Sequence, residues 1–305
     1  MTHREYLRLL EANQSPGNPE QYHEVAKSRE IFDETFVDKW LRDPLYIERL
    51  ILKHIVETCE LSVYFEYLVV NWHECNALSY IRRDGTPSSL VFDKVLDLSI
   101  MEVLLTVWAA EYKQECWDLC QKHLKVLIGQ KLAKRVITSD DRMDIIRVTQ
   151  MPDRAVQQAF GMYWAAWTFM VGHELFHIAN REDLSTREEE FRADRFGFQV
   201  LVKLIEEQKA GTIPEELDCY YEEYYLVPCM LMYIFSAMDR FKAGPLEYGR
   251  NDQHPSPEER MQAIIDLYDL GDIPDDMDTT NGNAFLTTFL DRFDELMGES
   301  EGQVR

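Results

Sequence analysis

Two histidines lie one helical turn apart near the middle of the chain, in the run HELFH at residues 173–177. On a helix, residues i and i+4 share a face, so His173 and His177 can both reach a single metal ion. Glu174 lies about 100° around the helix from His173 and projects beside that ion. Its carboxylate could there take a proton from a water that the metal activates. The pattern predicts metal-assisted hydrolysis with Glu174 as the general base.

An acidic segment that begins shortly after His177 supplies the candidate third ligand. A catalytic zinc ion usually has three protein ligands and one open position. Glu190 and Asp194 are one turn apart on one face of the helix predicted there. We expect Glu190 to bind the metal and Asp194 to orient a ligating histidine through its second ring nitrogen.

Small residues next to Glu190 and Asp194 favour this assignment. Ala193 and Gly197 are one turn apart and would let two helices approach closely. Glu188 and Glu189 are competing ligands, but they face other directions and lack this strip of small residues.

These motifs resemble those of a known family. The chain contains His-Glu-x-x-His, then Glu-x-x-Ala-Asp-x-x-Gly from Glu190, then His254-Pro255 shortly before Arg260. In this order they resemble the gluzincin metallopeptidases of the HtpX and CAAX-processing protease group. The resemblance implies a zinc site formed by His173, His177 and Glu190, and a peptide or protein substrate. It implies that His254 lies near the cleft, where it would either stabilise the oxyanion or hold the loop.

Some features depart from that family. Arg192 stands where a second Glu is common, the interval between the two motifs is short, and the membrane-spanning helices of HtpX-type enzymes are absent. In length and in the mid-chain position of its motif, the chain also resembles a cytosolic phage-exclusion protease.

Structural interpretations remain for each of these residues. The two histidines could be a hydrogen-bonded pair in the core, and Glu190 could belong to a solvated acidic run at a helix start. Asp194 could be a surface ion-pair partner of Arg187 or Arg195. His254, beside a proline, could simply mark the entry to a helix.

Two other function classes are also considered. A di-iron carboxylate protein needs a second Glu-x-x-His motif, and the one available, Glu20 to His23, lies in a region rich in Pro and Gly. A zincin-fold binding or sensing module would keep the metal without the chemistry. The presence of Glu174 favours the enzyme.

The elements that must position these residues are mostly helices. Apolar spacing predicts helices over much of 28–72, over 99–135, 155–179, 187–208, 222–240 and 257–267, and in the C-terminal region. Asp84-Gly85 between two short apolar runs predicts a hairpin near 79–92, and short strands are expected within 135–148.

The expected fold is therefore mainly α (α+β), with a zincin-like helical peptidase core and a small sheet. We divide the chain into a mostly helical N-terminal region (1–150), the peptidase core (151–270), and an acidic linker with an amphipathic helix (271–305).

The amino-acid composition argues against two classes of binding partner. The 305 residues include 55 Asp and Glu against 32 Lys and Arg, a net charge of −23, which argues against a general basic surface for nucleic acid and against a polybasic membrane anchor. No apolar run reaches the roughly 20 residues that span a bilayer, and no signal peptide is evident. We expect a soluble, cytoplasmic protein with free thiols. No feature of the sequence specifies an oligomeric state.

Overall fold

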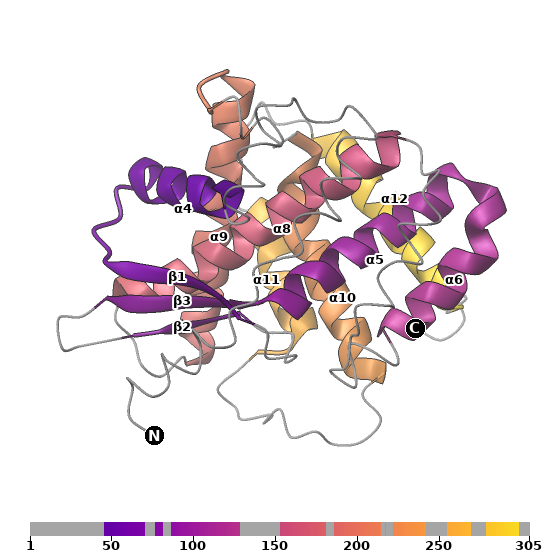
Figure 1. Cartoon of the computed structure of the whole chain (residues 1–305), viewed down its shortest axis with the longest axis horizontal. Helices are drawn as coiled ribbons and strands as arrows, with labels where there is room; N and C mark the ends of the chain where they lie inside the picture. Colours follow the sequence, from indigo (N-terminus) through magenta and orange to yellow (C-terminus); the bar gives the residue numbers. More distant parts are fainter. Residues whose placement is uncertain are drawn as a thin grey trace.

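The computed structural model describes residues 46–70, 77–81, 87–128, 153–180, 186–214, 217, 222–241, 255–269 and 279–298. Helices make up most of this part of the chain, and a single three-stranded sheet lies at one side of them (Figure 1). The expectation of a mainly α (α+β) fold is confirmed.

The sheet consists of β1 (Phe65–Val70), β2 (Ala77–Tyr80) and β3 (Ser88–Asp93), in the order β1-β3-β2. β3 pairs in parallel with β1 and antiparallel with β2, with Tyr80 opposite Ser89. Every residue of β3 is buried. A strand buried along its whole length is typical of the centre of a covered sheet.

The prediction of a helix was wrong for the segment that forms β1. Its residues FEYLVV are aromatic and β-branched, types that favour a pleated strand, and they pair with β3 along their whole length. The strands expected within 135–148 lie outside the described residues. The Asp84-Gly85 turn also lies outside them, between β2 and β3 in the chain.

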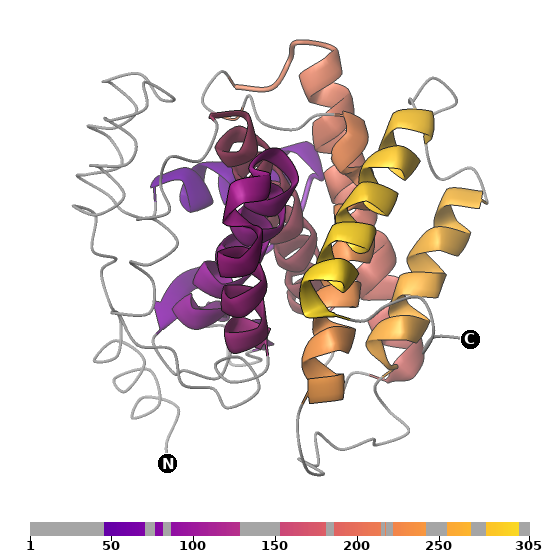
Figure 2. The same ribbon diagram turned by 90° about the vertical axis from the view of Figure 1, so that its right-hand side faces the viewer.

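The helices of the structure follow in chain order. They are α4 (Tyr46–Thr58), α5 (Lys94–Tyr112), the short 3-10 helix η1 (Gln114–Cys116), α6 (Trp117–Val126), α8 (Asp153–Asn180), α9 (Arg187–Lys209), the 3-10 helix η5 (Glu222–Leu226), α10 (Val227–Phe241), α11 (Pro257–Asp269) and α12 (Thr279–Met297). The long helix predicted from Ser99 is therefore interrupted at η1. Figure 2 shows the later helices, orange to yellow, on one side and the elements from α4 to α6 on the other.

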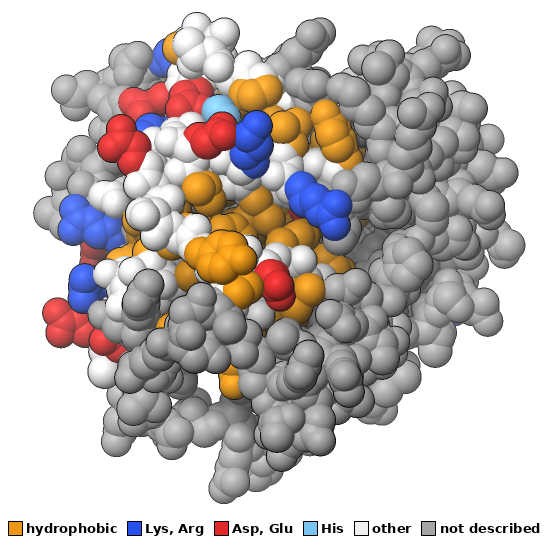
Figure 3. Space-filling model, turned by 60° about the vertical axis from the view of Figure 1, so that its left-hand side comes forward, with side chains coloured by type: hydrophobic (Ala, Val, Ile, Leu, Met, Phe, Trp, Pro, Cys, Tyr) orange, Lys and Arg blue, Asp and Glu red, His pale blue; other side chains and the backbone are white. Residues whose placement is uncertain are grey.

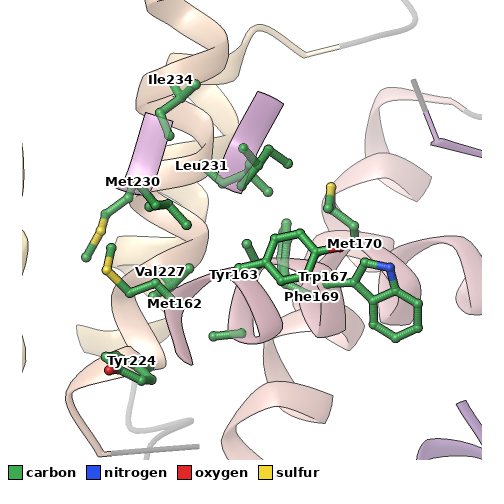
Figure 4. Packing of buried hydrophobic residues seen from close by; sticks show 14 of the residues in the cluster. Met162, Tyr163, Trp167, Phe169, Met170, Tyr224, Val227, Met230, Leu231 and Ile234 are labelled. Atoms are coloured by element: carbon green, nitrogen blue, oxygen red, sulfur yellow. The ribbon is translucent and has the colours of Figure 1, made fainter. Parts of the chain in front are cut away.

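One apolar core joins the sheet to the helices, and α8 runs through its centre. On one side of α8, Trp167 packs against Tyr67 of β1 and Phe92 of β3, with ring centroids 6.0 and 5.7 Å apart. On another side, α8 faces Tyr224 of η5 and several residues of α10 (Figure 4). The apolar residues that precede the histidine pair are thus buried, which anchors α8 within the core.

The helices α8 and α9 pack closely against each other at two glycines. A Cβ atom on Gly172 would lie 2.8 Å from the Cα of Gly197, and one on Gly197 would lie 2.5 Å from the carbonyl oxygen of Phe169. Ala193 is fully buried one turn before Gly197. These small residues allow the close contact that the two site-bearing helices need.

The face that carries α4 and the sheet has a mixed surface. Apolar side chains gather at its centre, with acidic and basic side chains around them (Figure 3). Tyr64, just before β1, is the most exposed of the large apolar residues in the described part, at 71%. Within the same part of the chain, no helix is both long enough and apolar enough to cross a membrane.

Candidate metal centre

The two histidines lie in the last two turns of α8, which ends at Asn180. His173 and His177 are each only 7% exposed. Their rings meet edge to face with centroids 4.9 Å apart, and the two Nε2 atoms are 3.2 Å apart. The i, i+4 spacing thus brings two imidazole nitrogens close enough to reach a single metal ion, as predicted.

The first turn of α9 presents Glu190 to these nitrogens. The helix begins with a capping box in which the Oγ1 of Thr186 accepts from the backbone N–H of Glu189 (3.3 Å), and the Glu189 carboxylate accepts from the N–H of Thr186 (2.6 Å). Glu189 is therefore engaged at the helix end. Glu188 is exposed, whereas Glu190 is 7% exposed and faces α8. Of the three consecutive glutamates, the structure brings Glu190 to the histidines.

The separations of the three side chains suit a small metal ion. The Glu190 carboxylate lies 3.4 Å from the Nε2 of His173 and 3.7 Å from the Nε2 of His177. Bonds of about 2.0–2.1 Å in tetrahedral geometry require ligand atoms about 3.3 Å apart. Within the described residues, these three side chains form the one group of His, Cys, Asp and Glu that could hold a metal ion.

Asp194 and Arg260 form a buried network behind His173. The Oδ1 of Asp194 lies 2.9 Å from the Nδ1 of His173, on the side of the ring that faces away from Glu190. Arg260 of α11 donates to both carboxylate oxygens, from Nε to Oδ2 (2.7 Å) and from Nη2 to Oδ1 (2.5 Å). Asp194 is 1% exposed, and its cation partner is Arg260, while Arg187 pairs with Glu259.

The charges of this network shift the pKa values of its members in the metal-free protein. Burial alone would lower the pKa of His173, but hydrogen bonds to Asp194 and Glu190 outweigh it and raise the pKa to about 9. Burial and the charge on His173 lower the pKa of His177. Burial would raise the pKa of Asp194, yet Arg260 and His173 hold it below its usual value. Asp194 is therefore a carboxylate.

Glu174 lies beside the site. Its side chain is half-buried and next in the chain to His173, and its negative charge partly opposes the lowering of the pKa of His177 and adds to the raised pKa of Arg260. Its carboxylate forms no hydrogen bond within the part of the chain that the structure describes. It is therefore near the histidines.

The remaining predicted residues differ in outcome. His254 and the Glu20 to His23 segment lie outside the described residues. Arg192, the departure from the family pattern, is exposed, and its guanidinium lies 5.3 Å from the ring centroid of Phe176. Arg260 follows the His-Pro motif in the sequence, and its spacing from Asp194 there gives no signal for the contact that the structure shows.

One comparison with known proteins points to a peptidase. Residues 130–276 match the model of the family Peptidase U49. The matched segment contains His173, Glu174, His177, Glu190, Asp194 and Arg260. No curated protein and no solved structure matches the chain.

Proposed function

We propose that this chain is a zinc-dependent metallopeptidase of the gluzincin type, with His173, His177 and Glu190 as metal ligands and Glu174 as the general base. The observation that carries the proposal is the convergence of two imidazole nitrogens and one carboxylate, 3.2–3.7 Å apart, in a buried position. A set of two His and one Glu leaves a fourth position open, which is typical of catalytic zinc.

The donor set fits zinc better than the alternatives. Imidazole ligands suit zinc, iron and copper, whereas calcium and magnesium prefer oxygen ligands alone. A di-iron site would need further carboxylates, and no second group of ligands occurs in the described residues. A bound zinc ion would act as a Lewis acid on the scissile carbonyl and bring the pKa of a water to about 7.

The remaining steps, which are proton transfer, ligand orientation and peptide binding, are carried out by residues of the chain. Glu174 accepts the proton of the attacking water and passes it to the leaving amine. Asp194 holds the ring of His173 so that its Nε2 faces the other ligands. Among the described strands β2 lies at an edge of the sheet and packs near α8, and an extended peptide could add to the sheet at such an edge.

The metal content of purified protein tests the ligand set. We expect about one zinc per chain by plasma mass spectrometry when no metal and no His tag are used. Glu190→Ala should lose the zinc because the third ligand is gone. Glu188→Ala, which removes the exposed neighbouring carboxylate, is the matched control and should keep it. Equal zinc in both variants would place the third ligand elsewhere.

Hydrolysis of a fluorogenic peptide library tests the general base. Glu174→Gln should keep the zinc and the fold but lose peptide hydrolysis, since an amide cannot accept the proton. A variant that cleaves at the wild-type rate would refute the role of Glu174. Wild-type protein that binds zinc but cleaves no peptide would instead favour a binding or sensing module.

A further inference from the structure

Arg260 is the residue whose position the proposed hydrolysis does not by itself explain. It lies on α11, 66 residues after Asp194 in the chain, yet it contacts both oxygens of that carboxylate. Its Nη2 also comes within 3.4 Å of the Nδ1 of His173. A bidentate pair of this kind is strong and restricts geometry, because both carboxylate oxygens are held in one plane with the guanidinium.

The hydrogen-bond donors and acceptors of Arg260, Asp194 and His173 allow only one arrangement of hydrogen bonds when a metal is bound. A guanidinium only donates, and an ionised carboxylate only accepts. Arg260 therefore donates to Asp194, and the close Nη2 and Nδ1 atoms both point to Oδ1 rather than to each other. His173 must then carry its proton on Nδ1. Its Nε2 lone pair is left facing His177 and Glu190.

The start of α11 explains how Arg260 reaches this place. The Oγ of Ser256 accepts from the N–H of Glu259 (3.3 Å), and the Glu259 carboxylate accepts from the N–H of Ser256 (2.8 Å). Pro257, at the first helical position, suits a helix start. This capping box fixes the first turn of α11, and Arg260 follows it directly.

We propose that Arg260 is the positioning residue of the metal centre. By donating hydrogen bonds to both oxygens of Asp194, it holds the ring of His173 in the orientation that binds the metal. It thereby increases the affinity for the metal. This inference rests on the proposed metal site, but not on peptide hydrolysis. Arg260 reaches His173 at Nδ1, on the opposite side of the ring from the ligand atom Nε2.

Zinc affinity of the full-length protein, measured by competition with a chromophoric chelator, tests the inference. Arg260→Gln should weaken zinc binding by about tenfold to a hundredfold, the range seen when groups that orient metal ligands are removed. Arg260→Lys keeps the charge but can hold only one oxygen well, so its affinity should fall between those of wild type and Arg260→Gln.

Arg187→Gln provides a matched control. Arg187 also links α9 to α11, through Glu259, but the pair is about half exposed and does not touch Asp194. Exposed pairs contribute little. This variant should bind zinc as wild type does, so an effect confined to Arg260 cannot be a general loosening of α11 from α9.

A double-mutant cycle separates positioning from a merely structural role. In Asp194→Asn, Arg260 has no carboxylate with which to form the bidentate pair. Adding Arg260→Gln to this variant should therefore weaken its zinc binding by less than about threefold. The visible spectrum of the cobalt(II)-substituted protein gives an independent readout, because a reoriented His173 changes the ligand field.

The outcomes are distinct. Wild-type affinity in both Arg260 variants, or an undiminished effect in the Asp194→Asn background, overturns the inference while the proposed function stands. Wild-type protein that binds no zinc overturns both. If Arg260→Gln does not fold, Arg260→Lys, which retains the buried charge, carries the same test.

Discussion

At the scale of single residues, the site depends on buried charges that compensate one another. Asp194 is almost fully buried and would be costly as an isolated carboxylate, but Arg260 and His173 both face it. Without metal, His173 carries the balancing positive charge. When a metal binds Nε2, the proton on that nitrogen must leave, while Nδ1 keeps its proton toward Asp194. Metal binding therefore replaces a proton on His173 by the metal ion, so the metal affinity depends on pH.

We predict that stabilisation by zinc increases with pH. The pKa of His173 in the folded metal-free protein is about 9, above the value of about 6.5 expected in the unfolded chain. The protonated ring therefore stabilises the metal-free fold fully below about pH 6.5, and this contribution is lost as the pH rises through 9. Zinc binds the unprotonated ring, so its competitor disappears over the same range.

Thermal unfolding with and without zinc, in non-chelating buffers from pH 6.5 to 9, measures this effect. The difference in melting temperature should grow with pH. Chelator-treated protein alone should become less stable. A difference that stays constant across the range would show that no proton is displaced from His173.

At the scale of elements, two helix starts bring the site residues into place. The α9 and α11 helices each begin with a capping box, Thr186 with Glu189 and Ser256 with Glu259, and in each the functional residue follows the box directly. A capping box fixes both the first residue of a helix and its rotation. Glu190 and Arg260 are consequently presented at defined angles to α8.

The glycine contact between α8 and α9 should control the same geometry. In Gly197→Ala, the added Cβ would lie 2.5 Å from the carbonyl oxygen of Phe169 and 3.1 Å from the backbone nitrogen of His173. Because both atoms are backbone, the helices must separate. We expect a loss of about 1–3 kcal/mol in the free energy of unfolding, together with weaker zinc binding.

Gly282→Ala is the control for this variant. Its Cβ would lie 2.3 Å from the ring of Tyr225, in the contact between α12 and η5, away from the metal centre. It should destabilise the protein and leave zinc affinity of the folded protein unchanged. Equal zinc affinity in both glycine variants would show that the spacing of α8 and α9 does not matter for the site.

At the scale of the whole molecule, the metal centre is supported by the sheet. The core cluster includes residues from α4 and β3 through to α12, and α8 contacts both the sheet and the later helices. Disturbance of the sheet should therefore reach α8 through Trp167, which packs on Tyr67 and Phe92.

We predict that Phe92→Ala destabilises the protein by about 3–5 kcal/mol and lowers the temperature at which zinc is released. Far-UV circular dichroism and a zinc indicator dye should report the same transition. Tyr64→Ala, which removes an exposed ring just before β1, should change stability by no more than about 0.5 kcal/mol. Zinc release at an unchanged temperature in Phe92→Ala would show that the centre is stable without the sheet.

The sequence by itself determined the features that depend on local spacing. Residues i and i+4 on a helix share a face whatever surrounds them, so the pairing of His173 with His177 and of Glu190 with Asp194 was predictable. So were most of the helices, because apolar periodicity records which face is buried.

Only the tertiary structure decided the features that depend on contacts distant in the chain. The β1 segment is a strand because it pairs with β3. Glu190, rather than its neighbours, reaches the histidines because α9 packs closely on α8 at Gly172 and Gly197. Arg260 reaches Asp194 because α11 packs on α9. Local propensity carries no record of such contacts, since their free energy comes from groups that meet only after the chain has folded.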